Sequence, residues 1–140
     1  MPIQYVYNTD FKLQNEQELS LWLNKVINSE NRVLGDLTYA FFNDEGLKKI
    51  NVKHLNRDYY TDVISFDDSC NEVINGNIAI SVDRVKENAK HYNCDFRNEM
   101  LRVMVHGLLH FMGFNDKTKK QKFSMKNAEN EKINMFHVEH

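Results

Sequence analysis

The chain has 140 residues, a formal net charge of −2, and 41% hydrophobic and 27% charged residues. This composition is typical of a globular protein, and the length predicts a single domain over residues 1–140. The charge argues against a strongly basic nucleic-acid-binding protein, and no apolar run approaches the ~20 residues of a membrane span.

The first half of the chain alternates between strand-like and helix-like patterns. Alternating residue types predict a strand over 3–7, and apolar residues at helical spacing predict a helix over 15–29. A strand over 37–42 and a helix over 47–55 follow. A β-rich strand over 61–66 then precedes Asn-Gly at 75–76, a dipeptide typical of hairpin turns, and a strand over 77–81.

The second half is predicted to be helical. Ser81 or Asp83 can cap a helix that reaches about residue 91, and a long apolar helix spans about 95–112. A last helix is expected from about 117 to 134. This order predicts an α+β fold, with one mixed sheet of about four strands and helices packed against it. The apolar helix should lie across the sheet, near a strand edge that forms a substrate groove.

The two cysteines indicate a reducing compartment. Cys70 and Cys94 form no Cys-x-x-Cys motif, so we expect buried small side chains rather than a disulfide framework. The first residues carry neither the charged segment nor the long apolar run of a secretory signal. These features predict a cytoplasmic protein.

The stretch His-Gly-Leu-Leu-His-Phe-Met-Gly-Phe-Asn-Asp, residues 106–116, is the most informative in the chain. His106 and His110 share one helix face because they are four residues apart. Gly113 is the residue type that ends a helix, after which the chain can bring Asp116 back to the imidazoles. Two imidazoles and a carboxylate, with one position open, match a catalytic zinc site. The alternative is a buried histidine pair beside an ordinary turn residue.

This spacing also matches the frame of metzincin peptidases. In such enzymes a Glu follows the first His and acts as the general base. Gly107 stands at that position here and cannot take a proton. The sequence therefore disfavours a peptidase of that design, and another group must manage the proton.

Three blocks of the chain resemble the sequence signature of the YbeY family of bacterial endoribonucleases. They are the histidine block at 106–114, Ile-Asn at 50–51 followed by Thr-Asp-Val-Ile-Ser-Phe at 61–66, and Asn-Gly-Asn-Ile-Ala-Ile-Ser at 75–81. The resemblance covers nearly the whole chain. It implies a single-domain α+β fold, one Zn²⁺ per chain, maturation of the 3′ end of small-subunit ribosomal RNA, and ribosome quality control. The implied partners are ribosomal RNA, the small ribosomal subunit and ribosome-associated proteins, and no membrane.

Carried over to this chain, the resemblance implies three metal ligands: His106, His110 and Asp116. The family usually has a third His where this chain has the aspartate. Zinc accepts a carboxylate oxygen, so the site should survive. The anionic ligand lowers the net charge of the site, which should make the metal a weaker Lewis acid.

The family's active-site Arg has no direct equivalent. Counting back from residue 61, that position is Leu55, and Arg57 two residues on is the remaining candidate for a catalytic role. Phosphodiester cleavage needs charge stabilisation at the phosphate. Without the Arg, the metal and nearby lysines must supply it. The lysines expected to contact the nucleic-acid backbone are Lys117, Lys119 and Lys120.

We therefore expect a zinc-dependent endoribonuclease that acts on single-stranded or loop RNA. The metal would lower the pKa of a bound water that attacks phosphorus, or would polarise a phosphoryl oxygen. The alternatives are a zinc peptidase of the metzincin-like frame and a non-catalytic ribosome-assembly factor. The latter would carry a structural metal closed by a fourth ligand, such as His137 or His140. An iron oxygenase with two histidines and a carboxylate is a further alternative.

Overall fold

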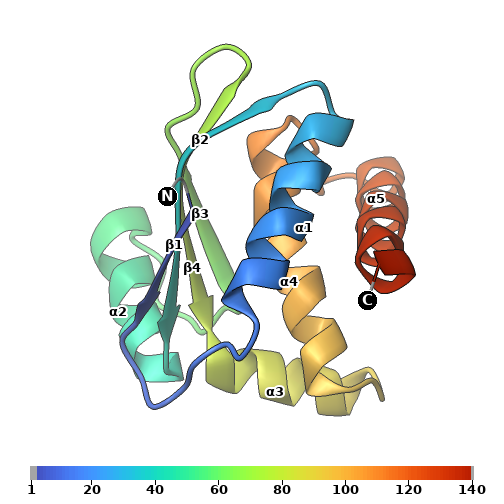
Figure 1. Ribbon diagram of the computed structural model, residues 1–140. Helices are drawn as coiled ribbons and strands as arrows, with labels where there is room; N and C mark the ends of the chain where they lie inside the picture. The colour runs from blue at the N-terminus through green and yellow to red at the C-terminus, as the bar shows by residue number, and fades with distance from the viewer. Residues whose placement is uncertain (1–2, 140) are drawn as a thin grey trace.

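The computed structural model describes residues 3–139. Within this range the chain forms one four-stranded sheet with helices packed around it, so the predicted α+β fold is confirmed (Figure 1). In chain order the elements are β1 (Ile3–Tyr7), α1 (Glu16–Ser29), β2 (Val33–Phe42), α2 (Asp44–Leu55), β3 (Val63–Asp67), β4 (Val73–Ser81), α3 (Val82–His91), α4 (Phe96–Phe111) and α5 (Lys119–Glu139).

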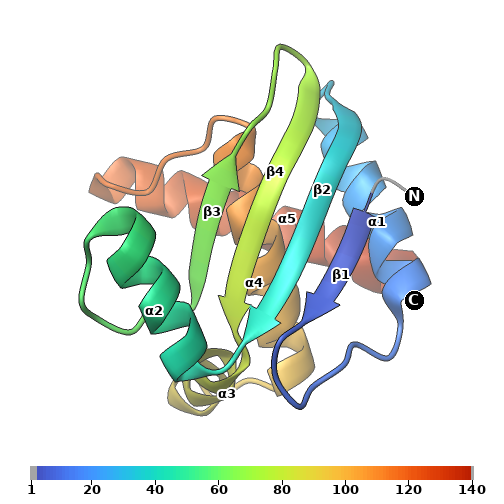
Figure 2. The ribbon, with the colours of Figure 1, turned by 90° about the vertical axis from the view of Figure 1, so that its left-hand side faces the viewer.

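The sheet is mixed and has the strand order β1-β2-β4-β3 (Figure 2). β1, β2 and β4 run parallel, and the edge strand β3 is antiparallel to β4. Helices α1, α4 and α5 lie on one side of the sheet and α2 lies on the other (Figure 1). The main core fills the side that carries α4, and a smaller cluster of Leu47, Ile64 and Ala79 lies under α2. No helix within residues 3–139 is both long enough and apolar enough to cross a membrane.

Helix α4 lies across the sheet, as expected, and its ends are well defined. Asp95 caps its first turn by accepting a hydrogen bond from the Asn98 amide at 2.7 Å. Ser81, one of the two predicted caps of α3, accepts a hydrogen bond from the Arg84 amide at 3.1 Å. At the centre of the core, the Tyr39 hydroxyl donates to the Met104 carbonyl at 2.9 Å and ties α4 to β2.

The prediction of a hairpin turn at Asn-Gly 75–76 is wrong, because β4 runs straight through this dipeptide. The turn between β3 and β4 comes earlier, where Cys70 pairs with Val73. Gly76 has a φ of +148°, and a Cβ there would lie 2.3 Å from the Phe66 carbonyl oxygen and 2.8 Å from the Phe111 ring. The glycine therefore permits a close approach between β4 and the end of α4, rather than a turn.

Two further expectations need correction. Cys70 and Cys94 are both exposed, so the expectation that they are buried is wrong. Helix α5 continues to Glu139 instead of ending near residue 134. Its extra turn is apolar on one side, where the Phe136 ring packs against the Trp22 ring of α1 at 5.5 Å between centroids.

A buried lysine joins α5 to α1. Lys132 is only 1% exposed, and its ammonium donates to the Ser29 hydroxyl at 2.9 Å and to the Glu30 carboxylate at 2.8 Å. Its backbone carbonyl accepts a hydrogen bond from the Trp22 indole at 2.7 Å. These contacts satisfy the buried polar groups between the first and last helices.

Candidate metal centre

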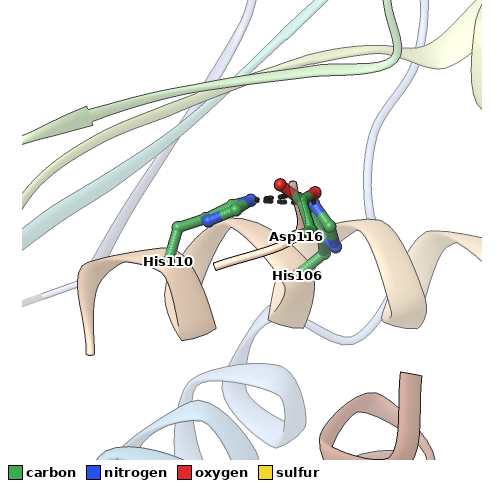
Figure 3. Close-up of side chains that lie close together, drawn as sticks. All are labelled: His106, His110 and Asp116. Atoms are coloured by element: carbon green, nitrogen blue, oxygen red, sulfur yellow. Dashed lines mark hydrogen bonds and ion pairs between the residues drawn. The ribbon is translucent and has the colours of Figure 1, made fainter. Parts of the chain in front are cut away.

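Three potential metal ligands converge beside the sheet (Figure 3). The Nε2 atoms of His106 and His110 are 3.0 Å apart, and Asp116 Oδ2 lies 3.4 Å and 3.5 Å from them. A tetrahedral Zn²⁺ with ligands at its usual distances keeps ligand atoms roughly 3.3–3.6 Å apart. The two distances to Asp116 match this spacing, and the Nε2–Nε2 distance is a few tenths of an ångström shorter, so a small movement of the rings admits one ion of that size.

The end of α4 explains how the carboxylate reaches the imidazoles. Gly113 has a φ of +95°, and its amide donates to the His110 carbonyl at 3.2 Å. The next amide, of Phe114, reaches back to the Leu109 carbonyl at 3.1 Å, which completes a glycine-terminated helix end. The chain then reverses and presents Asp116 to the helix it has just left, as the sequence predicted.

The hydrogen bonds of the two rings orient their lone pairs. His110 Nδ1 lies 2.9 Å from the Phe114 carbonyl oxygen, which can only accept, so Nδ1 carries the hydrogen and Nε2 is left with a lone pair. His106 Nδ1 lies 2.6 Å from a carboxylate oxygen of Glu129, which likewise places the hydrogen on Nδ1. Two lone pairs and the Asp116 carboxylate then face one point, an arrangement that a cation stabilises. The donor set therefore fits a divalent metal.

Glu129 on α5 contacts the candidate metal centre through His106, and the sequence analysis missed it. It is 7% exposed, and its second carboxylate oxygen accepts a hydrogen bond from Arg102 at 2.8 Å. Burial opposes protonation of His106, but the hydrogen bond and the charge of Glu129 outweigh it and raise the pKa of His106. The same negative charge favours a metal ion bound at Nε2 of that ring.

We expect Glu129→Gln to weaken metal binding by roughly 10–100-fold, because an outer carboxylate both orients its histidine and increases its basicity. The measurement is metal affinity by competition with a chromophoric chelator. Glu131→Gln is the matched control, since it makes the same change two residues along α5 at an exposed side chain. Equal affinities for the two variants would contradict the role given to Glu129.

Two cavities meet at His106 and Asp116, and His110 borders the second of them. The first has a volume of about 630 Å³ and is bordered by α3, α4 and α5. The second has a volume of about 490 Å³ and lies between the end of α2, the edge strand β3 and α4. Both are bordered by Asp62, Val63, His106 and Asp116. The ligands thus stand open to space on two sides, unlike a structural zinc site closed by protein.

The cationic residues expected at the site are only partly brought together. Arg57 borders the second cavity together with Leu55, so a guanidinium is present beside the position of the missing arginine. The three lysines at 117, 119 and 120 border neither cavity, and their contact with nucleic acid stays a prediction. Instead, Lys122 and Lys126, one and two helical turns into α5, border the first cavity.

Gly107 shows why a peptidase-type base is excluded from this helix. A Cβ at that position would lie 2.9 Å from Ile78 Cγ2 and 2.9 Å from the Ser65 hydroxyl. The glycine faces the sheet at van der Waals contact, so a glutamate side chain has no space there. The position that carries the base in the metzincin frame is part of the helix–sheet packing in this protein.

A structural metal would need a fourth protein ligand, and no such ligand lies with the other three among the described residues. The group able to hold a metal consists of three side chains there. His137 lies elsewhere, with its ring nitrogen 2.9 Å from the Asn98 side-chain oxygen. His140 lies outside the described residues.

Sequence comparisons identify relatives over nearly the full length. The profile of a family described as "Endoribonuclease YbeY" matches residues 5–137. A protein named "Endoribonuclease YbeY" from Flavobacterium johnsoniae is 47% identical over 137 residues, which are 98% of this chain and 99% of that protein. Its namesake from Christiangramia forsetii is 46% identical over 137 residues, covering 98% of this chain and 96% of that protein.

The fold has a similar solved structure. The solution structure of a Thermotoga maritima protein superposes with a TM-score of 0.71, covering 98% of this chain and 90% of that chain. Sequence identity between the two is 24%, so this likeness supports the fold alone.

Proposed function

Because this chain belongs to the YbeY family of endoribonucleases, we propose that it cleaves single-stranded RNA with one metal ion held by His106, His110 and Asp116. The observation that carries the proposal is the convergence of two imidazole Nε2 atoms and one carboxylate oxygen within 3.0–3.5 Å of one another. The open cavities on both sides of the three ligands support catalysis over a structural role.

Zinc is the proposed metal, since two histidines, one carboxylate and an open position are a common zinc arrangement in hydrolases. When bound, such an ion supplies Lewis acidity and lowers the pKa of water. The ligand rings are held by the Glu129 carboxylate and the Phe114 carbonyl, so they need little reorganisation to receive it.

The chain's own residues can supply the remaining chemistry. Arg57 in the second cavity offers a guanidinium to the developing negative charge at phosphorus, the role left open by Leu55. Asp62 borders both cavities and receives a hydrogen bond from the Asn88 amide at 3.0 Å. Burial raises the pKa of Asp62, which suits a carboxyl that exchanges a proton near the scissile phosphate.

In the cell, we propose the small ribosomal subunit as partner, with the 3′ end of its RNA as substrate and ribosome quality control as the wider role. The support for this step is family membership. We also propose a cytoplasmic location, because ribosomes are found there.

The test is cleavage of a labelled single-stranded RNA from the 3′ region of small-subunit ribosomal RNA, with the same sequence as a duplex for comparison. We expect cleavage of the single strand, loss of cleavage after metal is stripped with a chelator, and recovery when Zn²⁺ is restored. Full activity of the stripped protein would contradict the proposal. Cleavage of a peptide library without cleavage of RNA would favour the peptidase.

A further inference from the structure

We propose that one RNA strand crosses the three ligands from the second cavity to the first, with bases stacked on Tyr59 on one side and on Tyr92 on the other. The inference rests on the proposed function and specifies how that function holds its substrate. It assigns two base-binding subsites that flank the position of cleavage.

The cavities define the path of the strand. They are separate spaces of about 490 and 630 Å³ that share His106 and Asp116 on their walls. A chain of nucleotides with its scissile phosphate at the ligands can continue into both spaces, because the two share the same wall there. A compact small molecule would need only one of them.

Tyr59 supplies an aromatic surface to the second cavity. Tyr59 is 53% exposed, although the loop around it is fixed to α2. The Tyr59 carbonyl accepts a hydrogen bond at 3.0 Å from the side chain of Asn51, which is 1% exposed. The backbone is thus anchored and the ring is free to meet a base.

Tyr92 supplies an aromatic surface to the first cavity. It is 64% exposed and directly follows α3, where its amide donates to the Asn88 carbonyl at 2.9 Å. Its ring meets the His91 ring edge-on at 5.1 Å between centroids, which leaves a ring face open. Stacking on exposed aromatic rings is the usual way in which proteins hold unpaired bases without reading their sequence.

Charges are arranged for the same path. Arg57 borders the second cavity together with Tyr59, and Lys122 and Lys126 border the first cavity together with Tyr92. Among the described residues none of these three cations has a salt bridge, so they remain available to phosphates. Four carboxylates border the first cavity. Glu99 and Glu129 are 4% and 7% exposed and lie deep in its wall, whereas Asp62 and Asp116 stand where the two cavities meet. Arg57, Lys122 and Lys126 are all exposed, so a phosphate backbone along the rims of the two cavities can pair with them.

Tyr60 provides a matched control beside Tyr59. It is 44% exposed but borders neither cavity. Its hydroxyl donates to Glu45, and its ring lies 4.7 Å from the Lys48 ammonium. Tyr60 is thus an exposed tyrosine in the same loop whose ring is already occupied.

The experiment measures binding of a fluorescent 12-nucleotide single-stranded RNA by anisotropy, in chelator, so that cleavage does not intervene. We expect Tyr59→Ala and Tyr92→Ala each to raise Kd roughly tenfold, and the double variant roughly 100-fold, because the rings act in separate cavities. Tyr59→Phe and Tyr92→Phe keep the ring and should bind like wild type. Tyr60→Ala should stay within about twofold of wild type.

Two controls sharpen the outcome. A duplex of the same sequence should show no dependence on either tyrosine, because its bases are already stacked. The inference is overturned if either Tyr59→Ala or Tyr92→Ala binds the single strand as tightly as Tyr60→Ala. If wild type then still shows metal-dependent cleavage, the subsites fail and the proposed function stands. Loss of both binding and cleavage in wild type would remove the proposed function as well.

Discussion

His110→Ala is expected to retain at most about a tenth of the metal that the wild-type chain binds. Removing the ring deletes one of three protein ligands, whereas loss of an outer contact alone already costs roughly 10–100-fold in affinity. The His110 side chain is 30% exposed and its Nδ1 bonds only to the helix end, so the core should remain intact. Elemental analysis of both proteins, purified side by side without chelator, gives the metal content per chain.

His137→Ala is the control for that measurement. It removes a histidine whose ring contacts Asn98 rather than the three ligands, and its metal content should equal that of wild type. This control also tests the structural-metal alternative, in which His137 was a possible fourth ligand. Wild-type protein that carries no metal would remove the basis for the site, and so would full metal content in His110→Ala.

Asp116→Ala is expected to lower the rate of RNA cleavage by on the order of 100-fold or more. Its carboxylate is the only anionic atom among the three ligands, and it comes from a loop rather than from α4. Without it, the two imidazoles lie on one helix face with nothing to close the site from the opposite side. The measurement is the initial rate of cleavage of the single-stranded RNA under saturating metal.

Asp116→His separates the ligand role from general damage to the loop. This change installs the residue that the family usually has, and zinc accepts an imidazole there. We expect cleavage within about tenfold of wild type, since a neutral ligand raises the net charge of the site and compensates for changed geometry. If Asp116→Ala cleaves as fast as wild type, Asp116 is a turn residue and the site must be reassigned.

The convergence of His106, His110 and Asp116 was predictable because it depends on local geometry. Spacing of four residues aligns His106 with His110, and Gly113 supplies the reversal that returns Asp116. Glu129 was not predictable in the same way. It lies 23 residues beyond His106 on a different helix, and only the packing of α5 against α4 brings the two together.

The misread dipeptide at 75–76 shows a limit of local signals. Asn-Gly favours a turn, yet the same glycine also suits a strand that another backbone approaches closely. Here Asn75 accepts a hydrogen bond from the Asp36 amide at 2.7 Å, beside the irregular register between β2 and β4. The choice between turn and close contact is made by segments elsewhere in the chain: β2 at Asn75, and Phe66 of β3 with Phe111 of α4 at Gly76.

Arg57 shows that a residue's place in the sequence count and its place in the structure can differ. Counting along the chain leaves Leu55 at the place of the family's arginine, which would suggest a site without that charge. In the structure both residues border the same cavity as His106 and His110. A loop can therefore deliver a guanidinium to a site from a neighbouring position, which residue counting does not reveal.

The hydrogen bond from Trp22 to the Lys132 carbonyl has a consequence for synthesis. The two residues are 110 positions apart, so at typical elongation rates roughly 5–20 s separate their translation. During that interval α1 exists without α5, which covers Trp22 and whose Lys132 donates hydrogen bonds to Ser29 and Glu30. The nascent chain must therefore carry an exposed indole until the last helix is made, which makes this contact a late step in folding and a point at which a chaperone could bind.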